Sequence, residues 1–295
     1  MPDRLTTSVL VRYEGRMILF DAGEGIQIAL KQGGLGIKAL DAVVITHLHG
    51  DHVLGLPGIL MFRAQNQEPG PLTIIGPPGI QRFVRHNIDD LDYYINFDIE
   101  FVEWSKEAGN LAWSWNGVRL IWEELEHSTL CLGYRLEEPT RPGKFDPARA
   151  TELGVPMGPL FGQLQTGKTV TTPTGRIVRP EEVLGPSRRG RVVSFVTDCR
   201  PCPGARKLLA DADLAFVEGM FVSKHAEEAN EKGHMTAAEA GEMARASRLD
   251  RLVLVHVSPR YNGQDEKILE REAREYFPHA EVAEALKLYK VPLPD

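Results

Sequence analysis

The one-letter stretch DAVVITHLHGDH, residues 41–52, decides how this chain is interpreted. Residues 41–46 form a short apolar run suited to a buried strand, and a loop rich in histidine follows directly. On an extended segment, alternate residues such as His47 and His49 point to the same side. Asp51 and His52 follow where we expect a helix to begin. Imidazole and carboxylate groups are the ligands that zinc and similar divalent metals take. Core packing does not explain such a cluster, so the motif predicts a metal site.

An apolar, strand-like run that ends in a potential ligand recurs three times further along the chain. The ligands are His127 after residues 118–126, Asp198 after residues 192–197, and His256 after residues 252–255. Functional groups at strand ends can converge on one edge of a sheet. With the motif they supply enough ligands for two metal ions, and Asp198 can bridge them because a carboxylate has two oxygens. Two metal ions roughly 3.5–4 Å apart activate water and stabilise a displacement at phosphorus, so the pattern predicts a two-metal hydrolase.

The composition of the 295 residues is ordinary for a globular protein, with 42% hydrophobic and 25% charged residues. A net charge of -7 argues against nucleic-acid binding over the whole surface, so such contacts need a local basic patch or the metals. Three cysteines do not suit a secreted disulfide framework, and we expect Cys199 and Cys202 to be reduced thiols. Because no apolar run resembles a leader or a membrane span, we expect a cytoplasmic enzyme without membrane contact.

Apolar periodicity predicts the remaining elements. Strands are expected at residues 8–13, 16–20, 72–75, 99–104, 118–126, 131–136, 192–197, 214–217, 252–255 and 281–289. Helices are expected up to about residue 32 and over residues 52–64, 80–88 and 237–246. Strands that alternate with helices indicate an α/β or mixed layered architecture.

The segment 137–191 differs from the rest of the chain because it is rich in proline and glycine and basic. It holds nine Lys and Arg against six Asp and Glu, a charge of about +3, which leaves about -10 for the remainder. Loops of this length are uncommon unless they are functional. We interpret the segment as a protruding insertion, and the alternative is a long solvated loop.

Several short motifs, taken in order, resemble those of the ribonuclease Z family in the metallo-β-lactamase fold superfamily. They are FDAGEG at 20–25, THLHGDH at 46–52, GLPG at 55–58, GPPG at 76–79, LGVPMGPL at 153–160 and HVSPRY at 256–261. The resemblance implies a mixed α/β fold, a four-layer αββα sandwich. It also implies one domain over residues 1–295, with residues 137–191 inserted as a basic, flexible arm that binds tRNA.

The resemblance also implies how the metal ligands divide between two ions, which we expect to be Zn²⁺ with Mn²⁺ as a possible substitute. One ion would be held by His47, His49 and His127. The other would be held by Asp51, His52 and His256, with Asp198 bridging the two.

The same resemblance implies cleavage of the 3′ trailer from precursor tRNA, which leaves a 3′-hydroxyl on the tRNA and a 5′-phosphate on the trailer. Asp51 would orient the nucleophile, while His234, supported by Glu218, would protonate the leaving oxygen. The residues expected to bind substrate are Gly154, Pro156, Gly158, Pro159 and Arg260. Members of the family are commonly homodimers, in which the arm of one subunit holds tRNA for the active site of the other. The resemblance therefore implies a homodimer.

The chain departs from the family pattern at two places. The family's strand and glycine turn before the counterpart of residues 4–8 do not appear, which leaves open a misassigned start or a shortened chain. Methionines occupy positions 220 and 235, where the family has hydroxyl-bearing residues. Two other functions therefore stay open: a metallo-β-lactamase-fold phosphodiesterase or hydrolase with a different substrate, and a non-catalytic RNA-binding relative.

Overall fold

The computed structural model describes residues 6–261, 263 and 265–294. The chain divides into two compact units. The larger unit comprises Met1–Glu137 and Val192–Val291, and the smaller comprises Glu138–Arg191 and Pro292–Asp295. Among the described residues, no helix is long and apolar enough to cross a membrane.

The first sheet of the larger unit is built from the N-terminal third of the chain. Its strands, in spatial order, are β1 (Val9–Tyr13), β2 (Arg16–Phe20), β3 (Leu40–Val44), β4 (Leu72–Gly76) and β5 (Ile99–Glu103). β1 and β2 form the expected antiparallel hairpin, and the other neighbours are parallel. β1 lies at an edge of this sheet; the expectation about the segment before it falls partly on residues 4 and 5, which lie outside the described residues.

The second sheet carries seven strands. In spatial order they are β14 (Ala280–Val282), β13 (Leu252–Val255), β12 (Leu214–Glu218), β11 (Val192–Val196), β8 (Cys131–Glu137), β7 (Val118–Leu125) and β6 (Leu111–Trp115). Strands β11 to β14 run parallel, whereas β6, β7, β8 and β11 pair antiparallel. Parallel neighbours place their carboxyl ends on one edge of the sheet, where loops carry functional groups.

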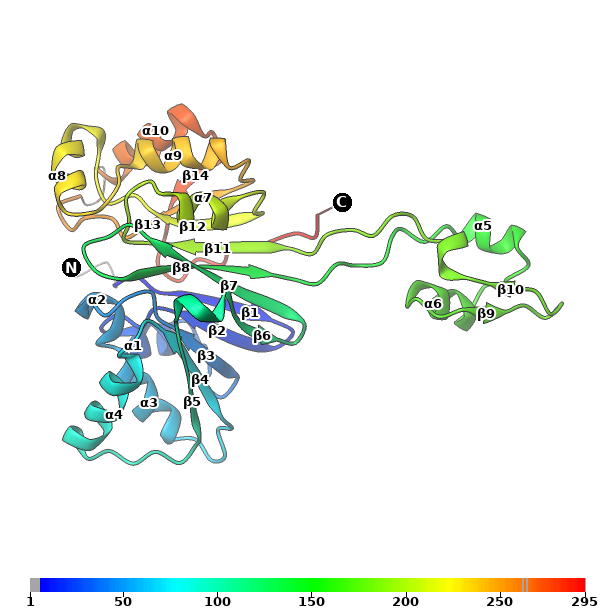
Figure 1. Ribbon diagram of the computed structural model, residues 1–295, viewed down its shortest axis with the longest axis horizontal. Helices are drawn as coiled ribbons and strands as arrows, with labels where there is room; N and C mark the ends of the chain where they lie inside the picture. Colours follow the sequence, from blue (N-terminus) through cyan, green and yellow to red (C-terminus); the bar gives the residue numbers. More distant parts are fainter. Residues whose placement is uncertain (1–5, 262, 264, 295) are drawn as a thin grey trace. The chain divides into compact units, whose positions relative to one another are not determined.

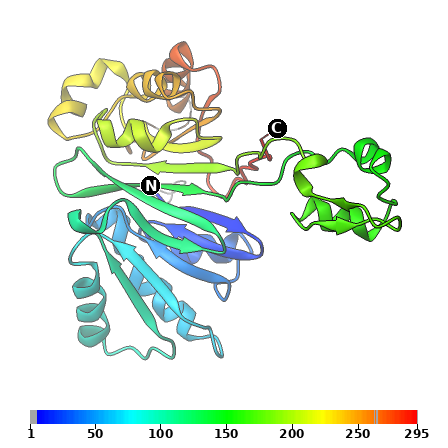
Figure 2. The same cartoon turned by 45° about the vertical axis from the view of Figure 1, so that its right-hand side comes forward.

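Helices cover the outer face of each sheet, so the larger unit has four layers in the order αββα (Figures 1 and 2). The first sheet is covered by α1 (Ile26–Gln32), α3 (Leu56–Ala64) and α4 (Ile80–Leu91). The second is covered by α7 (Pro203–Leu209), α9 (Ala237–Ala246) and α10 (Glu266–Tyr276). The core between the sheets includes Phe20, Trp122 and Phe195, all nearly inaccessible to solvent. The mixed α/β class and the sandwich expected from the sequence are confirmed.

The smaller unit has a hydrophobic core of its own. Its elements are α5 (Pro147–Glu152), α6 (Pro159–Gln165), the two-stranded sheet of β9 (Val170–Thr171) and β10 (Ile177–Val178), and the 3-10 turn η2 (Pro180–Glu182). Leu153, Val155, Leu164 and Val178 are buried together. Most of this segment is therefore folded structure rather than irregular loop.

Three details differ from the sequence-based expectations. The helix expected over residues 52–64 is two helices, α2 (Gly50–Val53) and α3. The Gly55 N–H between them donates to the carbonyl of Ala22 at 2.8 Å, outside the helix. The strand expected over residues 281–289 ends at Val282, and the chain then turns so that the Tyr289 hydroxyl accepts a hydrogen bond from the Glu284 N–H at 3.1 Å. In the larger unit, strand β6 and helices α7 and α10 were not predicted. The remaining short elements are η1 (Lys106–Ala108), η3 (Ser223–His225) and α8 (Ala226–Glu231).

Candidate metal centre

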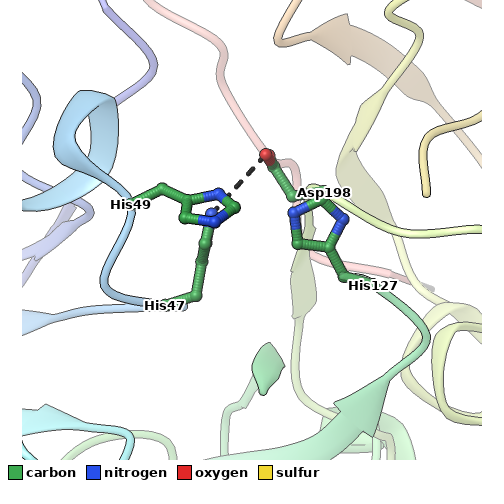
Figure 3. Close-up of side chains that lie close together, drawn as sticks. All are labelled: His47, His49, His127 and Asp198. Carbon is green, nitrogen blue, oxygen red and sulfur yellow. Dashed lines mark ion pairs between the residues drawn. The ribbon is translucent and has the colours of Figure 1, made fainter. Parts of the chain in front are cut away.

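Ligand-bearing side chains from distant parts of the sequence meet at the ends of strands from both sheets. His47 and His49 follow β3, His127 follows β7, and Asp198 follows β11; their ligand atoms lie within 4.8 Å of one another (Figure 3). A second group of the same compactness consists of Asp51, His52 and His256, and a third of Asp198, His234 and His256. The structure thus brings all seven sequence-predicted ligands into one centre.

Asp198 occupies the middle of this centre. Its Oδ2 atom lies 3.6 Å from Nε2 of His47 and 3.5 Å from Nε2 of His256, and its Oδ1 atom lies 3.4 Å from Nε2 of His52. Asp51 Oδ2 lies 3.3 Å from Nε2 of His256 on the outer side. The two oxygens of Asp198 therefore face histidines of both groups.

Three residues that end strands at the centre have left-handed backbone conformations. The φ angles are 53° at Asp21, 50° at Asp198 and 52° at His256. Non-glycine residues adopt this region rarely, and such strain gathers at functional sites. The sharp turn after β11 is held by the Thr197 hydroxyl, which donates to Asp198 Oδ1 at 2.6 Å. The backbone at these strand ends therefore fixes the direction of the side chains at the centre.

The imidazole rings are oriented by partners on their outer nitrogens. His52 Nδ1 lies 2.8 Å from Asp21 Oδ2, and His127 Nδ1 lies 3.0 Å from the carbonyl oxygen of Gly233. His47 Nδ1 lies 3.0 Å from the Thr46 hydroxyl. The inner Nε2 atoms of His47 and His52 are buried and have no hydrogen-bond partner among the described residues. Buried polar atoms rarely stay unpaired, and this arrangement is the usual one for metal-binding histidines, so the cluster fits a divalent metal ion.

The charge states of His47, Asp51 and Asp198 suit cation binding. Burial lowers the pKa of His47 to about 3, so that its ring is neutral at pH 7 and can donate a lone pair. A hydrogen bond from His256 lowers the pKa of Asp51 to about 2. Burial opposes ionisation of Asp198, but His256, His52 and His47 outweigh it and hold its pKa well below the usual range. Both carboxylates are therefore anionic at neutral pH.

His234 and Glu218 form a pair beside the metal-ligand cluster. Glu218 is the last residue of β12 and fully buried; its Oε2 atom lies 3.2 Å from His234 Nδ1 and accepts a hydrogen bond from Met235 N at 3.2 Å. Burial, with the nearby Asp198, raises the pKa of Glu218 well above its usual range. The His234 ring stacks on His256, with centroids 5.4 Å apart. Met235 packs in the core of the second sheet, so its side chain does not reach the centre.

The residues expected to bind substrate lie in two places. In the smaller unit, Gly154 and Gly158 have positive φ angles of 82° and 139°, and Pro156, Gly158 and Pro159 are exposed. In the larger unit, Arg260 makes a bidentate pair with Glu228, with nitrogen–oxygen distances of 2.7 and 2.6 Å. The Arg260 guanidinium is thus engaged by a carboxylate within its own unit.

Sequence reasoning missed two residues that hydrogen-bond to segments of the centre. Asp21 lies in the FDAGEG motif at the end of β2, a position that could have drawn notice, but no role was assigned to it. Arg200 donates to the backbone carbonyl of His234 at 2.5 Å; its partners lie more than thirty positions away, so no local pattern marks it. All three cysteines are free and buried, as expected for reduced thiols.

Comparisons with known proteins agree with this geometry. A family model described as "Anti-Pycsar protein Apyc1" matches residues 3–88, and one described as "Beta-lactamase superfamily domain" matches residues 162–257. Among solved structures, human tRNase Z, short form, superimposes with a TM-score of 0.69 at 22% identity, covering 99% of this chain and 95% of that chain. The metallo-β-lactamase fold protein YhfI from Bacillus subtilis does so with a TM-score of 0.64 at 16% identity, covering 95% and 89%.

Curated relatives are similar over nearly their whole length. Ribonuclease Z from Salinibacter ruber is 43% identical over 98% of this chain and 90% of its own. Ribonuclease Z from Haloferax volcanii is 36% identical over 99% and 91%. With this similarity and the clustered histidines and aspartates, the chain belongs to the ribonuclease Z family of the metallo-β-lactamase fold.

Proposed function

We propose that this protein is a metal-dependent endoribonuclease that removes the 3′ trailer from precursor tRNA, leaving a tRNA 3′-hydroxyl and a trailer 5′-phosphate. The observation that carries the proposal is the convergence of five histidines and two aspartates in a chain of this family. A dinuclear centre suits the in-line displacement at phosphorus that such a cleavage requires.

The proposed ligand sets follow the two groups of side chains. His47, His49 and His127 would hold one ion, and Asp51, His52 and His256 the other, with Asp198 shared. A set rich in imidazole favours Zn²⁺, and Mn²⁺ is the alternative. When bound, the metal pair would supply Lewis acidity and water activation at neutral pH.

The roles of the other groups follow from their positions. Asp51 is about half exposed and hydrogen-bonded to His256, so its carboxylate can orient the nucleophile. His234 is held on its Nδ1 side by Glu218, which leaves Nε2 to protonate the leaving 3′ oxygen. This last step matters because an alkoxide is a poor leaving group without a proton.

The proposal gives the smaller unit the task of binding tRNA. Lys168 and Arg176 are exposed there and can neutralise backbone phosphates. We also propose a homodimer in which the smaller unit of one subunit serves the centre of the other. A precursor-tRNA substrate makes the cytoplasm the proposed location.

The first experiment incubates purified protein with precursor tRNA and Zn²⁺ or Mn²⁺, with a chelator as control. We expect cleavage to a 3′-hydroxyl product, loss of cleavage with the chelator, and a large loss in His234→Ala. His86→Ala, which changes an exposed histidine on α4, is the matched control and should stay active. Hydrolysis of a chromogenic phosphodiester without any cleavage of tRNA would instead indicate another phosphodiesterase. Binding without any hydrolysis would indicate a non-catalytic relative.

The second experiment tests the arm and the dimer. A chain lacking residues 140–189 should bind tRNA weakly but hydrolyse the chromogenic phosphodiester at the normal rate, whereas equal loss of both would contradict the arm assignment. Co-expression of this deletion with His234→Ala should restore cleavage, since each mixed dimer pairs an intact centre with an intact arm. Inactive mixed dimers would show that arm and centre act within one subunit.

A further inference from the structure

Arg200 connects three loops that build the candidate centre. Its backbone N–H donates to the carbonyl of Glu126 at 2.8 Å, directly before His127. It lies two positions after Asp198, and its side chain reaches the segment of His234. One residue thus contacts the loops of a histidine ligand, the shared aspartate and the proposed general acid.

The guanidinium of Arg200 binds both a carbonyl and a carboxylate. Nη1 donates to the carbonyl oxygen of His234 at 2.5 Å and to Glu239 Oε2 at 3.1 Å, and Nη2 donates to Glu239 Oε1 at 2.5 Å. The side chain is only 19% exposed. A bidentate pair of this kind is geometrically specific, because the fork of donors is planar and rigid.

Glu239 is itself fixed, so the anchor is rigid. Its Oε2 atom accepts hydrogen bonds from the backbone N–H and the hydroxyl of Thr236, and the Thr236 hydroxyl accepts one from Glu239 N at 3.2 Å. This reciprocal arrangement is a capping box that starts helix α9. Arg200 therefore ties the His234 carbonyl to the first turn of a packed helix.

The backbone of His234 is held on both sides by this network. Its N–H donates to the carbonyl of Ala229 at 2.8 Å, and the carbonyl of Gly233 lies 3.0 Å from Nδ1 of His127. The one charged donor in this set is Arg200. Without it, the carbonyl of His234 loses this charged donor, and the backbone that carries the imidazole is held less firmly.

We propose that Arg200 is a positioning residue that holds the backbone of His234 so that its imidazole stays beside Glu218 and faces the leaving oxygen. This rests on the proposed function, in which His234 protonates that oxygen. Among the described residues, the Arg200 side chain contacts the His234 carbonyl and Glu239 rather than the side chain of a predicted metal ligand, so it acts through His234. Its loss should affect the protonation step more than metal binding or substrate affinity.

The leaving group distinguishes this role from a purely structural one. A ribose 3′ oxygen needs a proton as it departs, whereas the nitrophenolate of bis(p-nitrophenyl) phosphate departs without one. General acid catalysis contributes about 10²- to 10⁴-fold where it is needed. Loss of a residue that positions the general acid should therefore slow cleavage of RNA and hardly change hydrolysis of the activated diester.

The test compares Arg200→Met and Arg200→Lys with wild type on both substrates. Arg248→Met is the matched control, because Arg248 makes a bidentate pair with Asp211 on an exposed surface of the same unit. We expect Arg200→Met to lower kcat for precursor tRNA by about 10- to 100-fold, with KM within about threefold and the activated diester hydrolysed normally. Arg200→Lys should recover part of kcat, since one ammonium can still reach the His234 carbonyl. Arg248→Met should leave both rates unchanged.

Parallel loss on both substrates, or a changed KM with normal kcat, would overturn the proposal. Thermal melting and metal content of each variant show whether it is folded and loaded. If Arg200→Met does not fold, Glu239→Gln is tested in its place, because glutamine can still cap α9 but binds Arg200 less tightly. Glu239→Gln should show the same selective fall in kcat for precursor tRNA. If the wild type does not cleave precursor tRNA, the proposed function is refuted. If His234→Ala selectively loses tRNA cleavage but the Arg200 and Glu239 variants do not, only this inference is refuted.

Discussion

Asp21 Oδ2 lies 2.8 Å from Nδ1 of His52, and Oδ1 of the same carboxylate accepts the backbone N–H of Thr46 at 2.8 Å. The side chains of Asp21 and His52 are completely buried. The pairing turns Nε2 of His52 inward, toward Asp198, and carboxylates in this position also make the imidazole a stronger ligand. Asp21 therefore belongs to the centre, although its own oxygens face away from it.

Asp21→Asn should weaken metal binding without removing a ligand. An amide can still hydrogen-bond to His52 but brings no negative charge, so we expect the affinity to fall by about 10- to 100-fold. Competition with a chromogenic chelator measures this. Asp41→Asn is the control, because Asp41 pairs with Arg16 and Trp115 away from the centre. Equal affinities of Asp21→Asn and wild type would contradict the assigned role.

Metal should stabilise the fold as well as catalyse the reaction. The buried Nε2 atoms of His47 and His52 have no hydrogen-bond partner among the described residues, and coordination of a cation would satisfy their lone pairs. At free metal about 100 times Kd, the expected gain is about 2.7 kcal/mol, seen as a higher Tm than in chelator. Asp198→Asn should lose most of this response. An unchanged Tm in wild type would argue against tight binding.

Gly55→Ala should be strongly destabilising. A Cβ at this position would overlap the carbonyl oxygen of Gly23 and press on that of Ala22, and neither backbone can move freely. Overpacking of this kind costs about 1–3 kcal/mol. Gly36→Ala is the control, since a Cβ there meets open space. Urea unfolding compares the two, and similar midpoints would show that the turn between α2 and α3 adapts.

Arg63→Met should also reduce stability, for a different reason. Arg63 is completely buried, and its guanidinium donates hydrogen bonds to the backbone carbonyls of Ile37, Leu40, Pro69, Gly70 and Pro71. Burial lowers its pKa to about 10, so it remains charged at neutral pH. Methionine fills similar space but leaves several carbonyl acceptors unpaired. We therefore expect the free energy of unfolding, measured with urea, to fall by about 3 kcal/mol. Arg12→Met, at an exposed position on β1, should change stability little; equal effects would refute the explanation.

Local patterns in the sequence determined the candidate ligands and most of the framework. Each segment that carries a candidate ligand can be recognised in the sequence, because an apolar run long enough for a strand ends at a histidine or an aspartate, as at His47 and Asp198. The hairpin of β1 and β2 and the layered α/β class follow from the same short-range periodicity. These features depend only on neighbours within a few positions, which is the information that a single sequence carries.

Only the tertiary structure decided how the ligands are held. Asp21 and His52 are 31 positions apart, Arg200 and His234 are 34 apart, and His127 and Gly233 are 106 apart. The break at Gly55 likewise involves a distant residue, because the Gly55 N–H donates to the carbonyl of Ala22. Such pairings depend on the packing of strands and loops from both sheets, and packing over these separations leaves no periodic trace in the sequence. The chemistry could therefore be predicted from the residues, whereas the orientation of the groups that perform it required the fold.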